Sequence, residues 1–173
     1  QGGWIDVGFL AGSQVDKYGN INTTVIGDYN APKSRLPGSG GANPIGSLAK
    51  KVLIISLHDT RHMAEKVDFI TTPGYIDGPG SREKWGLPAN TGPSVIITNK
   101  AVLRFDKTTK VAYLESYHPD TSVDEVVKLT PWKLEVSDNV HETEPPRAEE
   151  LKALREILDP FRMIKIYEKR GYV

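Results

Sequence analysis

The pattern of hydrophobic and polar residues divides the first part of the chain into short strands separated by turns. Ile5 to Leu10 is an apolar run rich in β-branched and aromatic residues, which predicts a buried strand. The stretch from Gln14 to Ile26 predicts two strands joined by a turn at Lys17 to Asn20, because Gly19-Asn20 accepts the positive φ that such a turn needs. Gly27 to Pro37 contains two prolines and predicts a loop.

A glycine-rich stretch, a helix and an apolar strand are predicted next. Ile45, Leu48 and Ala49 recur at helical spacing and predict a helix from Pro44 to Lys51. The continuous apolar run from Val52 to Leu57 is typical of a parallel strand that is covered on both faces. This order of elements indicates an α/β fold.

The second half of the chain alternates loop, strand and helix patterns. A short strand is predicted at Val67 to Thr72, a long loop at Pro73 to Pro93 and a strand at Ser94 to Thr98. The remaining predicted elements are a hairpin with arms at Ala101 to Phe105 and Lys110 to Tyr117, a helix opened by Ser122-Val123-Asp124-Glu125, a brief strand at Leu134 to Val136, and a final helix starting at Pro145-Pro146 with Leu151, Leu154, Ile157 and Leu158 on one side. Together they predict an α/β fold with an open mixed sheet flanked by helices.

Composition restricts the class of protein. The chain has 173 residues, 38% hydrophobic and 25% charged, which suits one globular domain. Its 22 basic residues equal its 22 acidic residues, so no overall charge favours nucleic acid or an anionic membrane. No apolar run approaches the roughly 20 residues that span a bilayer. Without cysteine there is no disulfide or thiolate nucleophile, and we expect a cytoplasmic protein.

Two common kinds of catalytic site are not supported by the residue spacing. His58 and His62 are four residues apart, but Asp59 follows the first histidine where a zinc protease has glutamate, and no third ligand stands out. We therefore expect no metal site. No serine lies in a Gly-x-Ser-x-Gly motif, so a serine-hydrolase triad is also unsupported.

The stretch Gly38-Ser39-Gly40-Gly41-Ala42-Asn43, called the glycine loop below, is the strongest candidate for a binding site. Three glycines within four residues let the backbone bend and approach a ligand closely. Ahead of a helix, their N–H groups and the helix dipole suit an anion or a polarised carbonyl oxygen. Spacing alone supports a plain connecting loop equally well, because the motif is neither a P-loop nor a complete G-x-G-x-x-G.

Several motifs together resemble the β subunits of class I CoA-transferases, of the glutaconate type and, more distantly, the 3-oxoacid type. The similar stretches cover nearly the whole chain: Gln14 to Asn22, Ile26 to Tyr29, Gly38 to Asn43, Pro73 to Gly80, Gly86 to Pro88, Val95 to Asp106 and Leu154 to Pro160. The resemblance implies the NagB/RpiA/CoA-transferase type of fold. It also implies that coenzyme A (CoA) is a substrate, with no permanently bound cofactor.

The resemblance further implies a ping-pong reaction. A glutamate attacks an acyl-CoA thioester to form an anhydride, the CoA thiolate returns to give a glutamyl-CoA thioester, and an acceptor carboxylate takes the CoA. Oxyanions formed in these steps would be stabilised by the backbone of Gly38, Gly40, Gly41 and Ala42. The residues expected to contact the substrate or CoA are Gln14, Asn20, Asn22 and Asn43.

One departure from the family pattern limits what this chain can do. The family's nucleophile lies in a Glu-Ser-Gly or Glu-Asn-Gly motif, and no glutamate here is followed by either pair; Glu115-Ser116 continues to Tyr117. We therefore expect residues 1–173 to be the C-terminal portion of a β-subunit-like domain, inactive alone. A preceding β-subunit segment would supply the glutamate, and an α subunit would complete a hetero-oligomer acting on acyl-CoA and small carboxylic acids. Two alternatives are a CoA-thioester hydrolase or ring-opening enzyme of the same superfamily, and a non-catalytic binding domain.

Overall fold

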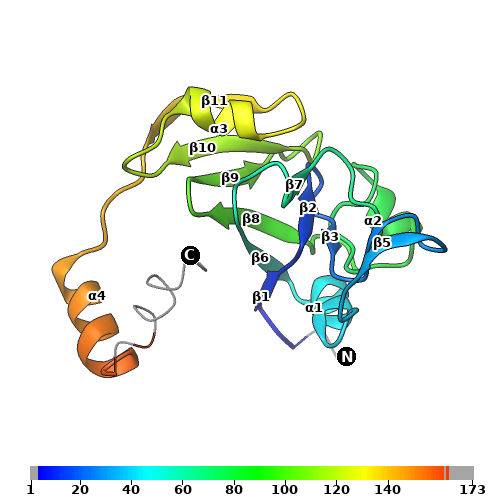
Figure 1. Cartoon of the computed structure of the whole chain (residues 1–173), viewed down its shortest axis with the longest axis horizontal. Coiled ribbons are helices and arrows are strands. Elements are labelled where there is room, and N and C mark those ends of the chain that lie inside the picture. Colours follow the sequence, from blue (N-terminus) through cyan, green and yellow to red (C-terminus); the bar gives the residue numbers. More distant parts are fainter. Residues whose placement is uncertain (1–3, 162, 164–173) are drawn as a thin grey trace. The chain divides into compact units, whose positions relative to one another are not determined.

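The computed structural model describes residues 4–161 and 163 (Figure 1). Residues Gln1–Glu142 cluster into one compact unit and residues Thr143–Val173 into a second. The single domain expected over residues 1–173 stays a prediction.

A six-stranded sheet organises the first unit, and its strands lie in the order β1-β6-β8-β9-β10-β11. Strands β1, β6 and β8 run parallel, β9 is antiparallel to both of its neighbours, and β11 is parallel to β10. Their bounds are β1 (Val7–Ala11), β6 (Lys51–Ser56), β8 (Pro93–Thr98), β9 (Ala101–Phe105), β10 (Ala112–Tyr117) and β11 (Glu135–Glu142). The predicted open mixed sheet and the predicted hairpin are confirmed, and β11 is longer than expected.

One row of apolar side chains crosses five strands and forms the centre of the core. Leu10 pairs with Ile54, Ile54 with Ile96, Ile96 with Leu103, and Leu103 with Leu114. Leu10 is 8% exposed and the other four are fully buried. Because alternate residues of a strand point to opposite faces, this row defines the buried face of the sheet.

Helices α1 (Ala42–Leu48) and α3 (Val123–Leu129) supply residues to this core. Helix α1 approaches β1 so closely that a Cβ on Gly8 would lie 2.4 Å from the Ile45 side chain, so glycine is required there. Helix α3 begins as predicted, with the Ser122 hydroxyl accepting a hydrogen bond from the Glu125 N–H. Helix α1 starts and ends earlier than predicted, and Lys51 already belongs to β6.

The opposite face of the sheet is open at β1 and β6. Phe9 is 63% exposed, Ile55 50% and Val7 43%, and β1 has only β6 as a neighbour in this sheet. The expectation that the Val52–Leu57 strand is covered on both faces is therefore wrong within the described residues. An apolar run shows that a strand needs cover on both faces, but it does not show which chain or segment provides that cover.

Two small sheets lie beside the main one. Strands β2 (Gln14–Asp16), β3 (Ile21–Asn22) and β7 (Met63–Ala64) form the first, and β4 (Val25–Gly27) pairs with β5 (Pro32–Arg35) in the second. The predicted turn between β2 and β3 is confirmed, since Gly19 has a φ of 68°.

Two predictions about these small sheets are wrong. Residues 27–37 were expected to be loop, but they contain β5, which tolerates Pro32 because a proline at the start of an edge strand loses no ladder hydrogen bond. Val67 to Thr72 was expected to be a strand, but only Thr72 forms a bridge, to Ile21. The polar stretch before it contains β7 instead.

The predicted long loop is confirmed over residues 73–92, with one short helix, α2 (Ser81–Lys84), inside it, and Pro93 already belongs to β8. In the second unit, α4 (Ala148–Ala153) continues as the π-helix η1 (Leu154–Leu158), which confirms the predicted final helix with a slightly later start.

Candidate functional site

The glycine loop is fixed at both ends by hydrogen bonds. It follows β5, and the Gly38 N–H donates to the Thr23 carbonyl oxygen at 2.7 Å while the Thr23 hydroxyl donates to the Gly38 carbonyl at 2.9 Å. At the other end, the Ser39 carbonyl accepts from the Ala42 N–H at 2.9 Å, and the Ser39 hydroxyl oxygen accepts from the Asn43 N–H at 3.1 Å. In the middle of the loop, the Gly40 carbonyl accepts from the Ser39 hydroxyl at 3.3 Å and the Gly41 carbonyl from the Ile45 N–H at 3.2 Å, so the loop is held along its length.

Three consecutive backbone N–H groups in this loop, those of Ser39, Gly40 and Gly41, find no acceptor within the described residues. Two of them belong to the glycines predicted for the oxyanion site. Gly40 has a left-handed φ of 48°, and Gly41 is right-handed with φ −82° and ψ −4°. Such alternation aims successive N–H groups at one point and forms an anion-binding concavity. A Cβ on Gly40 would have no atom within 4 Å, so the space in front of it is open.

The four backbone groups predicted for an oxyanion site therefore divide into two pairs. The N–H groups of Gly38 and Ala42 are already bonded within the protein, whereas those of Gly40 and Gly41 are available. Helix α1 has only seven residues, so its macrodipole is short. We therefore attribute the positive potential at the loop to the N–H groups of Gly40 and Gly41.

The Asn43 side chain connects the glycine loop to the segment around Thr71. Its side-chain Nδ2 donates to the Thr71 carbonyl at 2.9 Å, and the Thr71 hydroxyl oxygen accepts from the Thr23 N–H at 2.9 Å. The side chain of Asn43 is exposed next to the free N–H groups. Of the four side chains predicted to contact substrate, it is the one that belongs to the glycine loop itself.

Gln14 and Asn22 tie the small sheets together. Asn22 is fully buried, and its Nδ2 donates to Gln14 Oε1 at 2.7 Å and to the Val25 carbonyl at 2.6 Å. Gln14 in turn donates to Asp68 Oδ2 at 3.1 Å, and the same carboxylate oxygen accepts from the Gly27 N–H at 2.8 Å. These bonds fix the hairpin that leads into the glycine loop. A direct contact of Gln14 or Asn22 with CoA stays a prediction.

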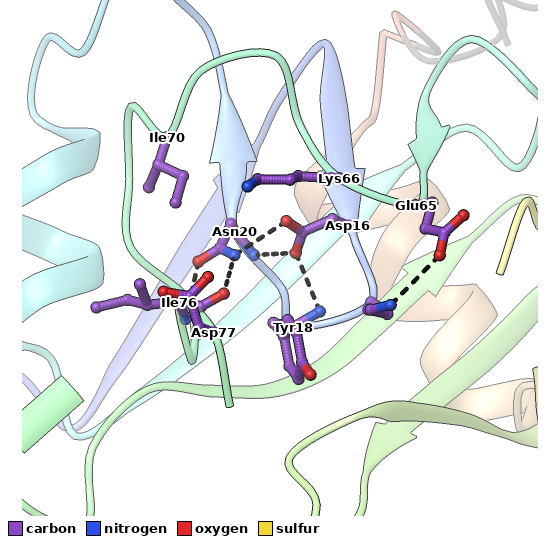
Figure 2. A pocket seen from close by; sticks show the side chains of 9 residues that line it. Asp16, Tyr18, Asn20, Glu65, Lys66, Ile70, Ile76 and Asp77 are labelled. Carbon is purple, nitrogen blue, oxygen red and sulfur yellow. Dashed lines mark hydrogen bonds and ion pairs between the residues drawn. The ribbon is translucent and has the colours of Figure 1, made fainter. Parts of the chain in front are cut away.

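Asn20 lies at the back of a cavity of about 500 Å³, shown in Figure 2. Its Nδ2 donates to Asp16 Oδ2 at 2.9 Å and to the Ile76 carbonyl at 2.8 Å, and its Oδ1 accepts from the N–H groups of Gly74 and Ile76. The amide has no hydrogen-bonding capacity left. Contact between Asn20 and CoA stays a prediction, and the observed bonds hold the turn and the following loop together.

The same cavity is lined by charged side chains. Burial raises the pKa of the Asp16 carboxyl, and hydrogen bonds from Asn20 and Tyr18 oppose that rise. Lys17 and Glu65 form an ion pair at 3.5 Å on one side, and Lys66 points across the opening (Figure 2). The volume falls within the range of small-molecule pockets. The full lining is Asp16, Lys17, Tyr18, Asn20, Glu65, Lys66, Ile70, Ile76 and Asp77.

The two histidines considered for a metal site have separate roles. His58 follows β6 and is 1% exposed, with Nδ1 3.1 Å from Thr98 Oγ1 and Nε2 2.9 Å from Thr130 Oγ1. Burial lowers its pKa to about 4, so the imidazole is neutral at pH 7. His62 instead faces Asp59, with 2.9 Å between Nδ1 and Oδ1. In the part of the chain that the structure describes, no group of three potential ligands could hold a metal ion.

Arg82 is a buried cation that sequence reasoning missed. It is 2% exposed and donates to five oxygens at 2.9 to 3.2 Å, which are the carbonyls of Pro73, Gly74, Gly46 and Ser47 and the hydroxyl of Thr91. These bonds attach the long 73–93 loop to helix α1, which carries the glycine loop at its start. Nothing in the local sequence distinguishes this arginine from a solvated one.

The fold is that of an α/β protein, and its glycine loop carries backbone N–H groups that no described residue accepts. Residues 1–129 match the family described as Coenzyme A transferase. The chain belongs to this family, and none of the helices within residues 4–161 is long and apolar enough to cross a membrane.

Two curated relatives are more than 40% identical to the chain over the aligned residues. The β subunit of glutaconate CoA-transferase from Acidaminococcus fermentans is 44% identical over 154 residues, covering 89% of this chain and 57% of the relative. The β subunit of 3-oxoadipate CoA-transferase from Pseudomonas knackmussii is 46% identical over 155 residues, covering 90% of this chain and 59% of the relative. The chain thus spans less than two thirds of either relative.

A solved structure supports the same assignment. The crystal structure of glutaconate coenzyme A-transferase from Acidaminococcus fermentans superposes with a TM-score of 0.83 and 42% identity, covering 91% of this chain and 60% of that chain. The resemblance to CoA-transferase β subunits and the predicted fold class are confirmed.

Proposed function

We propose that this chain is part of a CoA-transferase that moves CoA between an acyl-CoA and a carboxylic acid through a glutamyl-CoA intermediate. In this proposal, the N–H groups of Gly40 and Gly41 donate to the oxyanion that forms on the thioester carbonyl. The supporting observation is that these two neighbouring N–H groups find no acceptor among the described residues and are held by a loop that is bonded at both ends. CoA is a substrate, and the proposal includes no permanently bound cofactor.

The proposed chemistry needs these donors more than once. Attack of a carboxylate on a thioester, and return of the thiolate to the anhydride, each place negative charge on a carbonyl oxygen. Donors that are already in position stabilise that charge without reorganising during the reaction. Because the loop is anchored by Thr23 and by Ser39, the same site serves each step.

The other predicted site residues act mainly by positioning in this proposal. The N–H groups of Gly38 and Ala42 form hydrogen bonds that hold the two ends of the loop. The side chains of Gln14, Asn20 and Asn22 hold the strands and the turn that precede it. Asn43 is the exposed member, and we assign the direct substrate contact to its side chain.

The proposal requires two further polypeptide segments. This chain contains no glutamate in the family's nucleophile motif, and it spans 57% and 59% of relatives that are each named as one subunit of a CoA-transferase. We propose that a preceding β-subunit segment supplies the glutamate and covers the open face of β1 and β6. We propose that an α subunit completes the hetero-oligomer. We also propose that the enzyme is cytoplasmic, as expected from the sequence.

A hydrolase of the same superfamily is the alternative, and it is not favoured. Both relatives above 40% identity are named as CoA-transferases. For the 173-residue chain by itself, we propose that it binds but does not turn over acyl-CoA. Measurable transfer by the purified chain alone would refute that part.

A borohydride trap on the assembled enzyme tests the reaction type. The enzyme would be incubated with acyl-CoA, treated with borohydride and analysed by intact mass. Reduction of a glutamyl-CoA thioester, with loss of activity, is expected. Release of free CoA without any trapped enzyme would instead establish hydrolysis.

A further inference from the structure

The β4–β5 hairpin, which leads directly into the glycine loop, carries two exposed cations. Lys33 and Arg35 lie on β5, and neither forms an ion pair with any described residue. We propose that these two side chains bind the phosphate groups of CoA. This inference rests on the proposed function, because it concerns the far end of the same substrate.

The guanidinium of Arg35 is held on an aromatic support. Its central carbon lies 4.6 Å from the centre of the Tyr29 ring, and its Nη2 donates to the Tyr29 carbonyl at 2.5 Å. The Tyr29 ring in turn stacks on Phe69, with 5.4 Å between centroids and 25° between planes. A guanidinium has five N–H donors, and among the described residues only this one bond engages them. The remaining donors are fixed in a planar fork, which suits phosphate oxygens.

Lys33 is placed by an irregularity in the hairpin. Ile26 pairs with Ser34 but Gly27 pairs with Pro32, so Lys33 is an extra residue on its strand. Such a bulge changes the direction of a side chain. Gly27, opposite the bulge, has a φ of 86°, which favours glycine, and a Cβ there would be in ordinary contact with Lys33 Cγ at 3.4 Å.

The carboxylates of the same region are engaged elsewhere. Asp28 accepts from the N–H groups of Asn30 and Ala31, and Asp68 accepts from Gln14 and from the Gly27 N–H. Among the described residues, neither Asp28 nor Asp68 forms an ion pair with Lys33 or Arg35. A double positive charge therefore remains available for an anionic ligand.

The spacing along the chain keeps Arg35 within reach of a substrate bound at the glycine loop. The hairpin's pairing continues to the glycine loop, because the Leu36 N–H donates to the Thr24 carbonyl and the Gly38 N–H to that of Thr23. Arg35 precedes Gly40 by only a few residues, so their backbones are at most about 18 Å apart. An extended pantetheine arm spans roughly 16 Å from sulfur to phosphorus, by standard bond lengths. A thioester at Gly40 thus allows the diphosphate to reach Arg35.

The test compares substrates with and without phosphate. In the assembled enzyme, kcat and KM would be measured for an acyl-CoA and for the matching acyl-pantetheine, which lacks every phosphate. For the double variant Lys33→Ala/Arg35→Ala we expect KM for acyl-CoA to rise about 10- to 100-fold, the loss given by one or two charge-assisted hydrogen bonds. The kinetics with acyl-pantetheine should not change. Lys107→Ala, an exposed lysine in the β9–β10 turn, is the matched control and should change neither.

Three outcomes would overturn the inference. An equal loss with both substrates, or no loss with either, would show that the cations do not contact phosphate. Loss of co-purification with the α subunit would show that the hairpin binds protein instead. If the unaltered assembled enzyme transferred CoA from neither thioester, the proposed function itself would fail, which is a distinct result.

Discussion

The Ser39 hydroxyl oxygen lies 3.1 Å from the backbone nitrogen of Asn43 and accepts its N–H, across the start of helix α1. The Ser39 carbonyl also accepts from the Ala42 N–H at 2.9 Å. Between these bonds, Gly40 and Gly41 are left with N–H groups that no described residue accepts. One serine therefore closes the loop without using the two donors that we assign to the oxyanion.

Ser39→Ala removes the hydroxyl acceptor and leaves the Asn43 N–H unpaired by the loop. Loss of a comparable capping bond typically costs about 1 kcal/mol. We expect kcat of the assembled enzyme to fall by roughly fivefold to tenfold, because the donors are less well held. Ser137→Ala is the control, since it removes a similar hydroxyl acceptor for the Asn139 N–H in β11. A similar fall of kcat in both variants would contradict a local role of Ser39.

His58 makes stability depend on pH below neutrality. Its pKa is about 4 in the folded protein and about 6.5 when unfolded, so between these values only the unfolded state is protonated. The free energy of unfolding should therefore fall as the pH falls from 6.5 to 4, by about 3 kcal/mol in total. Denaturant unfolding at pH 7.0 and pH 4.5 measures this loss. His58→Gln should show a clearly smaller fall over that interval, and an equal fall would exclude His58 as its cause.

Arg82→Ala removes the donor of five hydrogen bonds and leaves several carbonyls buried without partners. Each unpaired buried group is costly, so we expect the free energy of unfolding to fall by about 3 kcal/mol or more. The loop at residues 73–93 should also become sensitive to limited proteolysis. Lys84→Ala, an exposed residue on the same short helix, should stay within about 0.5 kcal/mol of the unaltered protein. Unchanged proteolysis in Arg82→Ala would argue against the loop-anchoring role.

Substitution of Phe9 tests whether another polypeptide segment covers the open face of β1 and β6. Its side chain is 63% exposed on edge strand β1, and such strands promote association. We expect Phe9→Glu to reduce self-association of the 173-residue chain in light scattering, and to prevent assembly of the complete β subunit with its partner. Thr108→Glu, at an exposed residue of the β9–β10 turn away from this face, is the control that adds the same single negative charge. Normal assembly of the Phe9 variant would contradict the proposed covering segment.

The sequence predicted most of the main sheet because local patterns carry that information. Alternation in the 110–117 arm, the Ser122 capping box and the Gly19 turn each depend on residues only a few positions apart. By contrast, β5 and β7 were missed, because their stability comes from pairing with strands that the local pattern does not reveal.

The sequence indicated the glycine loop as a candidate site, and its role in binding an oxyanion stays a prediction. Which N–H groups are free depends on Thr23 and on Ser39, whose bonds to the loop are tertiary or require a known backbone path. Arg82 and His58 could not be placed either, since burial is decided by distant segments. The family resemblance indicated the chemistry, and the structure shows that two of the four candidate N–H groups, those of Gly38 and Ala42, are bonded within the protein.

The central claim is that the Gly41 N–H stabilises an oxyanion, and one pair of variants tests it directly. Gly41→Pro removes this N–H at a φ of −82°, close to the range of proline, whereas Gly41→Ala keeps it and adds a Cβ whose nearest neighbour, in the Ile45 side chain, is 4.0 Å away. The rate of acyl transfer from acyl-CoA would be measured in the assembled enzyme for both variants, with melting temperatures to confirm folding. We predict a rate about 100- to 1,000-fold lower for Gly41→Pro than for Gly41→Ala, which is the usual cost of losing one oxyanion donor. Equal rates in two folded variants would contradict the account.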